Sequence, residues 1–145
     1  VGDIYLDFNF TDFLNIREVK NDELNFLTLI KKDAFIFNIK DVYLNGILRG
    51  EKTFEFRLNT EERKKIKIGD LIYLKSTSHI AAAKVASVYF FKSWEEVLSK
   101  HFETDFAHCF KNKEDALKEL SKYYTDLDIE KYGLVAYELS EVKSV

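Results

Sequence analysis

The chain of 145 residues has no proline and no methionine, and it contains only five glycines and one cysteine. A single cysteine excludes an internal disulfide, so Cys109 fits a reducing compartment. The shortage of proline and glycine predicts loops with few rigid turn residues. The sequence also lacks any run of about 18 apolar residues and any basic-then-apolar leader, which predicts a cytoplasmic protein that makes no membrane contact.

Aromatic and charged residues are abundant instead. The sequence has 13 phenylalanines and eight tyrosines, and 46% of its residues are hydrophobic, which suits one domain with an aromatic-rich core. The net charge of −3 disfavours non-specific binding to nucleic acid. The charge is uneven, however, because residues 39–94 carry 11 basic and 6 acidic side chains, whereas residues 95–145 carry 7 and 12. A phosphate-bearing ligand is therefore expected at the middle segment.

Hydrophobic patterns give an order of elements from residue 35 onward. Period-two runs predict strands over residues 35–40, 52–58, 71–76, 81–91 and 132–142. A short helix is predicted after Asp41, ending before Gly50. The S-x-x-E pattern of Ser93 and Glu96 predicts a helix that begins at Trp94, and Asn112 is expected to cap a second one over residues 113–124. This order indicates an α+β domain around a small, mostly antiparallel sheet or barrel.

The stretch "GEKTFEFRL", residues 50–58, combines this strand pattern with an unusual density of charge. Alternation places three apolar side chains on one face, Phe54, Phe56 and Leu58. It places three polar side chains on the other face, Thr53, Glu55 and Arg57. Lys52 stands at the start of the strand, where a turn at Gly50 brings its amine to the same side. The spacing leaves two interpretations open, a solvent-facing surface with weak ion pairs and a functional cleft.

Several segments resemble the ASCH domain family of the PUA-like superfamily. They are "FIFNIKDVYLNGILRGEKTFEFRL", "KIGDLIYLKS", "AAAKVASVYFF", "SWEEVL" and "YGLVAYELSEV". The family signature G-x-K-x-x-E-x-R is present as Gly50, Lys52, Glu55 and Arg57, and a G-D turn follows at residues 69–70. The resemblance covers about residues 35–142 and indicates a domain over residues 35–145. Residues 1–34 form an extension outside it, either the tail of a preceding domain or a lid.

The resemblance implies a small PUA-like, mostly antiparallel β-barrel flanked by helices. It also implies a cleft that is lined by the signature residues and binds RNA or a nucleotide-like ligand, without a metal or cofactor. Family members tend to line the cleft from the segment that holds Lys40 and Tyr43, and a tyrosine there can stack on a base. Packing of Tyr43 in the core fits the sequence equally well. The expected ligand-binding residues are Lys40, Tyr43, Lys52, Thr53, Glu55 and Arg57.

The resemblance leaves open whether the protein is an enzyme. Some small members of the superfamily hydrolyse acetylated cytidine or cleave RNA, and the signature lysine, here Lys52, is taken as catalytic. In the amidohydrolase branch, the position that corresponds to Glu55 is a threonine that is thought to act as the nucleophile. Thr53 of this chain does not correspond to that threonine. A hydrolase of modified nucleosides or RNA would use Lys52 and Glu55 as an acid–base pair. We expect pairing with Glu55 to keep Lys52 charged, which favours binding over catalysis.

Three further features have weaker interpretations. The basic residues Arg63, Lys64, Lys65 and Lys67 fit a guide for a nucleic-acid backbone, but the adjacent Glu61 and Glu62 favour a solvated loop. His101, His108 and Cys109 have no fourth ligand at metal-binding spacing, which favours a buried structural cysteine. The acidic C-terminal helices leave a third hypothesis, a protein-interaction module.

Overall fold

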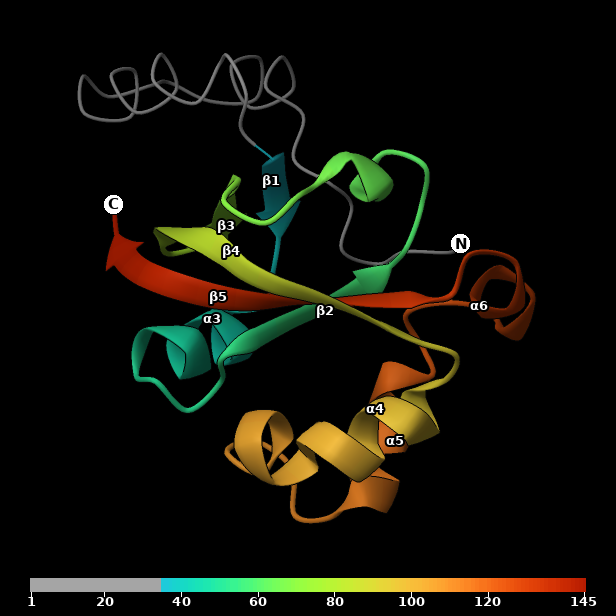
Figure 1. Ribbon diagram of the computed structural model, residues 1–145. Coiled ribbons are helices and arrows are strands. Elements are labelled where there is room, and N and C mark those ends of the chain that lie inside the picture. Colours follow the sequence, from blue (N-terminus) through green and yellow to red (C-terminus); the bar gives the residue numbers. More distant parts are fainter. Residues whose placement is uncertain (1–34) are drawn as a thin grey trace.

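The computed structural model describes residues 35–145, and the extension over residues 1–34 lies outside the described residues (Figure 1). One sheet contains all five strands, β1 (Phe35–Asn38), β2 (Phe54–Leu58), β3 (Leu71–Lys75), β4 (Ile80–Phe91) and β5 (Leu134–Ser144). The helices are α3 (Asp41–Leu48), α4 (Trp94–His101), α5 (Lys113–Leu120) and α6 (Asp126–Tyr132). Two shorter turns complete the part of the chain that the structure describes, the 3-10 turn η1 (Arg63–Lys65) and the π-helical turn η2 (Phe102–Phe106).

The sheet is a curved half-barrel with the strand order β1-β3-β4-β5-β2. Strand β1 runs parallel to β3, and every other neighbouring pair is antiparallel. The register of β4 against β5 shifts at residues 82–84 and again at 85–87. Such irregularities bend a strand and increase its twist, which curls the two long strands around the core. The predicted α+β fold with a mostly antiparallel sheet is confirmed.

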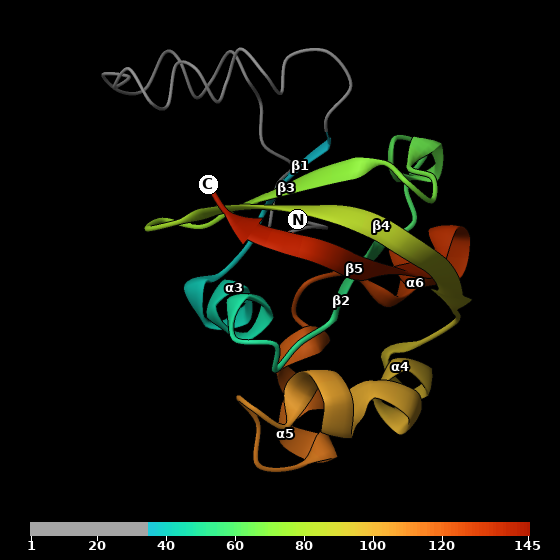
Figure 2. The same cartoon turned by 60° about the vertical axis from the view of Figure 1, so that its left-hand side comes forward.

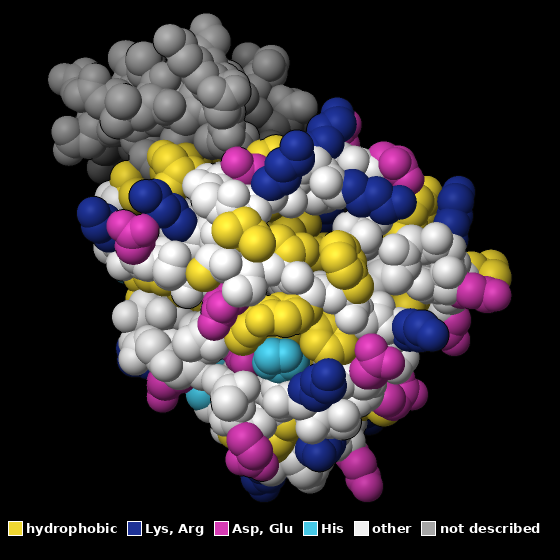
Figure 3. Space-filling model, viewed as in Figure 1, with side chains coloured by type: hydrophobic (Ala, Val, Ile, Leu, Met, Phe, Trp, Pro, Cys, Tyr) yellow, Lys and Arg dark blue, Asp and Glu magenta, His cyan; other side chains and the backbone are white. Residues whose placement is uncertain are grey.

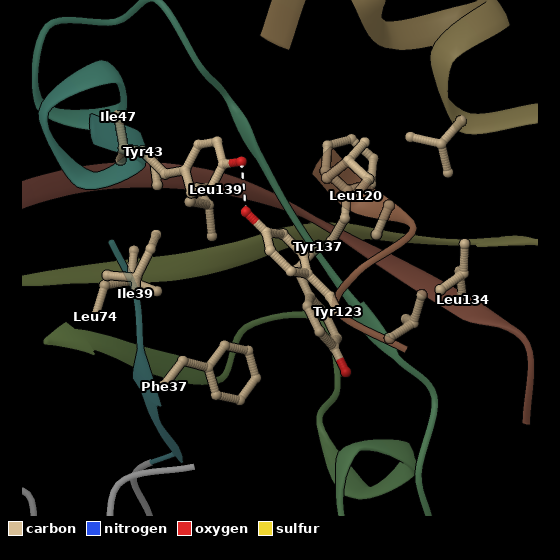
Figure 4. Close-up of a cluster of buried hydrophobic side chains, with 14 of the residues drawn as sticks. Phe37, Ile39, Tyr43, Ile47, Leu74, Leu120, Tyr123, Leu134, Tyr137 and Leu139 are labelled. Carbon is tan, nitrogen blue, oxygen red and sulfur yellow. Dashed lines mark hydrogen bonds between the residues drawn. The ribbon is translucent and has the colours of Figure 1, made fainter. Parts of the chain in front are cut away.

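The core lies inside this curved sheet and beneath the helices. Its most completely buried side chains include Phe37, Ile72, Leu74, Val85 and Tyr137, each 2% exposed or less. Figure 4 shows part of this cluster, in which aromatic rings of strands and helices meet. The aromatic-rich core that the composition indicates is therefore what joins the sheet to its helices.

The helix starts follow from side-chain caps, as the sequence predicts. Ser93 Oγ accepts a hydrogen bond from the Glu96 backbone N–H at 3.1 Å, and Asn112 Oδ1 accepts one from the Asp115 N–H at 2.8 Å. Helix α5 ends at Leu120, however, so the predicted continuation to residue 124 is wrong. The chain forms a turn there instead.

Both helices predicted after β4 are present, but η2 extends α4, and a further helix that was not predicted, α6, follows α5. Helix α6 has no buried residue, and Leu127 on it is 77% exposed. A helix without a buried stripe gives no apolar periodicity to detect. Its signals are instead the Thr125 cap, which accepts from the Asp128 N–H at 3.1 Å, and Gly133 just past its end.

Helices α4 and α5 lie together on one side of the sheet in both ribbon views (Figures 1 and 2). Helix α3 lies separately, between the end of β1 and the start of β2, so it leads the chain from one edge strand of the sheet to the other. Within residues 35–145, no helix is long and apolar enough to cross a membrane.

Candidate functional site

A narrow cavity lies where the two edge strands approach α3, α4 and α5. We call it the Lys52 cavity. It is lined by Ile39, Tyr43, Lys52, Glu55, Phe56, Arg57, Trp94, Phe106, Leu120, Tyr123 and Tyr124. Its volume of about 20 Å³ is room for about one water molecule. The cavity therefore brings three of the signature residues together with aromatic rings from four other parts of the chain.

Lys52 reaches this cavity because the chain reverses between α3 and β2. Gly50 has a φ of +76°, a backbone conformation that favours glycine, and it directly follows the end of α3. The Gly46 carbonyl oxygen then accepts hydrogen bonds from the backbone N–H groups of Glu51 at 2.8 Å and Lys52 at 3.2 Å. This turn fixes the backbone of Lys52 against the helix end.

The next anchor of the segment is Asp105, a fully buried residue of η2. Its Oδ1 accepts hydrogen bonds from the backbone N–H groups of Thr53 at 2.7 Å and Phe54 at 2.9 Å. Its Oδ2 accepts one from the Thr104 hydroxyl at 2.8 Å and lies 3.3 Å from Nδ1 of His101. Asp105 thus holds the first residues of β2, directly after Lys52. No motif in the sequence marks this role, because the carboxylate and its partners are about 50 residues apart.

The amine of Lys52 is surrounded by aromatic rings. The residue is 3% exposed, and its Nζ lies 4.7 Å from the ring centre of Phe56, 5.0 Å from that of Phe106 and 5.8 Å from that of Tyr43. It forms no salt bridge or hydrogen bond with another side chain among residues 35–145. Burial lowers the pKa of Lys52, against the opposing attraction of the Glu55 and Asp105 carboxylates. Lys52 is therefore a buried hydrogen-bond donor whose amine lies among aromatic rings.

Arg57 is buried in a different way, because its guanidinium is hydrogen-bonded. Its Nε donates to Glu55 Oε2 at 2.8 Å, and its Nη2 lies 2.8 Å from the same oxygen. Its Nη2 also donates to the Asn38 carbonyl oxygen at 2.5 Å, and its guanidinium carbon lies 4.7 Å from the ring centre of Phe37. Since Asn38 ends β1 and Arg57 is on β2, this side chain bridges the two edge strands.

Two expectations about this strand need correction. The solvent-facing interpretation is wrong, because the side chains of Arg57 and Glu55 are 1% and 6% exposed. The expected pairing of Lys52 with Glu55 is also wrong, because Glu55 pairs with Arg57 and leaves the Lys52 amine to the rings. The alternation itself is correct, since Glu55 and Arg57 lie on the sheet face opposite Phe56.

The remaining predicted ligand-binding residues separate into one inside the cavity and two outside it. Tyr43 lines the cavity, and its hydroxyl lies 2.8 Å from that of Tyr123. The side chain of Lys40 is 45% exposed and pairs with Glu119 at 3.2 Å, outside the lining. Thr53 is exposed, since the chain only enters the sheet at Phe54. Geometry therefore groups Tyr43, Lys52, Glu55 and Arg57.

The basic run after β2 divides into a structural and a solvated part. Arg63 is 4% exposed, donates to the Leu58 carbonyl oxygen at 3.1 Å and lies over the Phe37 ring. Lys64 and Lys65 pair with the glutamates three residues before them. Figure 3 likewise shows basic and acidic side chains interspersed around a hydrophobic centre on one face. The solvated-loop interpretation fits the two lysines.

The histidines and the cysteine do not form a metal site. In residues 35–145, no group of three His, Cys, Asp or Glu side chains is placed to hold a metal ion. His108 packs against Gly46, where an added Cβ would lie 2.5 Å from its Nε2. Cys109 is partly buried, and burial raises the pKa of its thiol. Trp94, the first residue of α4, is 3% exposed and lines the Lys52 cavity.

Comparisons with known proteins agree with this architecture. The chain is 28% identical to the hypothetical protein PH0355, whose crystal structure superposes with a TM-score of 0.63 over 76% of this chain and 96% of that one. For protein PF0455 from Pyrococcus furiosus the identity is 25% and the TM-score 0.57, over 76% of this chain and 94% of that one. The ASCH protein from Zymomonas mobilis, 13% identical, shares the fold with a TM-score of 0.52 over 77% and 70% of the two chains.

No curated protein sequence matches the chain. The family model described as the ASCH domain, however, matches residues 37–143, which is most of the chain and contains the whole Lys52 cavity. The mixed five-stranded half-barrel with its helices is also the architecture of the ASCH and PUA-like structures. The chain therefore belongs to the ASCH domain family.

Proposed function

We propose that residues 35–145 form an RNA-binding module whose Lys52 cavity receives a nucleobase of a single-stranded segment or of a nucleotide-like ligand. The observation that carries this proposal is Lys52, a residue 3% exposed whose amine faces three aromatic rings and has no side-chain hydrogen-bond partner among the described residues. A buried donor of this kind is costly unless it binds something. A ligand oxygen or ring nitrogen supplies the missing acceptor.

The polar groups of the cavity match the edge of a base. Glu55 lines the same cavity, and its carboxylate is paired with the guanidinium of Arg57. The guanidinium of Arg57 is already engaged by Glu55 and Asn38. What remains is one amine donor, a carboxylate acceptor and aromatic walls. A planar base with donors and acceptors along its edge matches that set.

The test is a titration with short single-stranded RNA at two salt concentrations, comparing the wild type with Lys52→Met. Methionine keeps an apolar stem of similar length among the rings and removes the amine. The affinity is expected to fall about tenfold or more, because a hydrogen bond between a charged group and a ligand contributes about 1.5–3 kcal/mol.

Lys64→Met is the matched control, because Lys64 is an exposed lysine paired with Glu61 and lies outside the cavity. It should lower the affinity only slightly, and only at low salt. Absence of binding at low salt, or equal loss in both variants, would reject the proposed role of the cavity.

A small hydrolase is the second candidate, and two observations favour it. The pKa of Lys52 is lowered by burial, as a general base requires, and the cavity beside Glu55 has room for about one water molecule. Incubation with acetylated cytidine and with mixed RNA, comparing wild type and Glu55→Gln, tests this candidate. Unchanged substrate in every sample would exclude the enzyme, while turnover that Glu55→Gln abolishes would favour it.

A further inference from the structure

The Lys52 cavity is too narrow for the ligand that its chemistry selects. Its volume of about 20 Å³ compares with about 300–1,000 Å³ for pockets that enclose drug-sized molecules. A planar ring cannot enter while the walls stay where they are. Binding therefore requires one wall to move.

One wall differs from the others in how it is built. The sheet side of the cavity belongs to β2, which is held by its ladder with β5 and by Asp105. The opposite side consists of three residues at the end of α5 and in the turn after it, Leu120, Tyr123 and Tyr124. We call these three residues the α5 cover. They belong to no strand, so they can move without breaking the sheet.

Polar contacts join the α5 cover and the neighbouring Glu119 of α5 to the region around α3 on the other side of the cavity. The hydroxyls of Tyr43 and Tyr123 lie 2.8 Å apart (Figure 4). Lys40 Nζ donates to Glu119 Oε2 at 3.2 Å, and the Tyr123 hydroxyl donates to the same oxygen at 3.3 Å. We call this set of contacts the latch. It connects residues about 80 positions apart in the sequence.

The latch combines a partly exposed ion pair with a buried hydroxyl pair. Lys40 and Glu119 have side-chain exposures of 45% and 27%, and ion pairs at such positions are weak. A hydroxyl pair also regains hydrogen bonds with water when it separates. On its other side the α5 cover is attached through rings, since Trp94 of α4 and Tyr124 are nearly parallel, at 8°, with centroids 6.2 Å apart. Opening at the latch therefore breaks two polar contacts and exposes part of the buried α5 cover, while the ring contact with α4 is kept.

We propose that the α5 cover is a gate over Lys52, and that breaking the Tyr43–Tyr123 and Lys40–Glu119 contacts admits the ligand. The inference rests on the proposed function, because it assumes that the ligand goes to Lys52. It adds the route by which the ligand enters the cavity. The latch also controls the apparent affinity, because only molecules whose latch is open bind the ligand.

The test measures how fast a small amine-reactive acetylating reagent modifies Lys52 in the full chain, followed by peptide mass spectrometry. Tyr123→Phe removes the hydroxyl contacts of the latch, and Glu119→Gln removes the charge that attracts Lys40; each keeps the shape of the side chain. Each is expected to speed acetylation of Lys52 about fivefold, the factor that corresponds to the net contribution of one hydrogen bond. No RNA is needed, so this test remains valid if RNA fails to bind.

Lys122→Met is the matched control. Lys122 also pairs with Glu119, at 3.3 Å, but it lies three residues away on the same segment and does not reach α3. It should leave the rate at Lys52 unchanged. Urea denaturation of each variant separates gating from global unfolding. Equal rates in the wild type and both latch variants would overturn the proposal, and so would acceleration that also occurs in Lys122→Met or that follows global stability.

Discussion

Two buried cations of one short segment, Lys52 and Arg57, differ in what surrounds them. Arg57 has a carboxylate, a backbone carbonyl and an aromatic face around its guanidinium. Lys52 has three rings and no carboxylate within ion-pair distance among the described residues. Burial alone therefore does not define a site. A satisfied buried charge supports the fold, whereas an unsatisfied one is a cost that the protein retains for binding or chemistry.

The largest effect is expected from removing the guanidinium of Arg57, the buried cation whose charge is paired. Arg57→Met leaves Glu55 buried without its partner and frees the Asn38 carbonyl oxygen that joins the two edge strands. Removal of one partner from a buried pair costs about 3–5 kcal/mol. Urea denaturation monitored by circular dichroism should show that loss. A variant as stable as the wild type would contradict the structural role of Arg57.

Asp105→Ala should have the next largest effect, because Asp105 holds the backbone between the two buried cations, Lys52 and Arg57. The substitution leaves the N–H groups of Thr53 and Phe54 without their acceptor. We expect the free energy of unfolding to fall by about 2–4 kcal/mol. Asp105→Asn keeps an acceptor oxygen and should cost less. Equal losses in the two variants would indicate that the charge of Asp105 matters more than its hydrogen bonds.

The burial of Lys52 should affect how the stability of the fold depends on pH. The pKa of Lys52 is lowered in the folded protein from its ordinary value of 10.5. The unfolded chain therefore binds more protons than the folded one between the lowered pKa and 10.5, and stability rises with pH across that window. The slope approaches about 1.4 kcal/mol per pH unit for one proton. Lys52→Met should flatten it, and an unchanged slope would assign the titration to another group.

The smallest effect is expected at Asp41, a hydrogen-bonded carboxylate that is only partly buried. Asp41 Oδ2 and Oδ1 accept hydrogen bonds from the hydroxyls of Thr77 and Ser78, both at 2.8 Å. Hydrogen bonds from Ser76, Thr77 and Ser78 lower the pKa of Asp41 to about 2. Its contribution to stability is present above pH 3.8 and is lost as the pH falls through about 2.

Thermal unfolding measured between pH 2 and pH 5 checks this contribution. The wild type should lose stability across that window more steeply than Asp41→Asn. Parallel curves for the two proteins would show that the loop hydroxyls do not stabilise the charged carboxylate.

The sequence was sufficient for features that depend on neighbours along the chain. The strand alternation of residues 54–58, the capping of α4 by Ser93 and the Gly50 turn each follow from local rules, and the structure has all three. The family signature additionally identified three cavity residues that lie within six positions of one another, Lys52, Glu55 and Arg57.

Features that depend on distant partners were not predictable. Asp105 has its role only because η2 returns to β2, and Tyr123 lines the cavity only because α5 ends early. The predicted pairing of Glu55 with Lys52 was wrong for the same reason, because Glu55 pairs with Arg57. The pairing with Arg57 depends on the Asn38 carbonyl and the Phe37 ring, which hold the guanidinium where it meets Glu55.

The most direct measurement compares stability and RNA affinity in the single variant Lys52→Met. If Lys52 is the ligand group, the variant should be at least as stable as the wild type, because a buried amine without a charged partner has been removed, and it should lose RNA binding. A variant that unfolds more easily and still binds short RNA with wild-type affinity would show that Lys52 supports the fold, and would contradict the account.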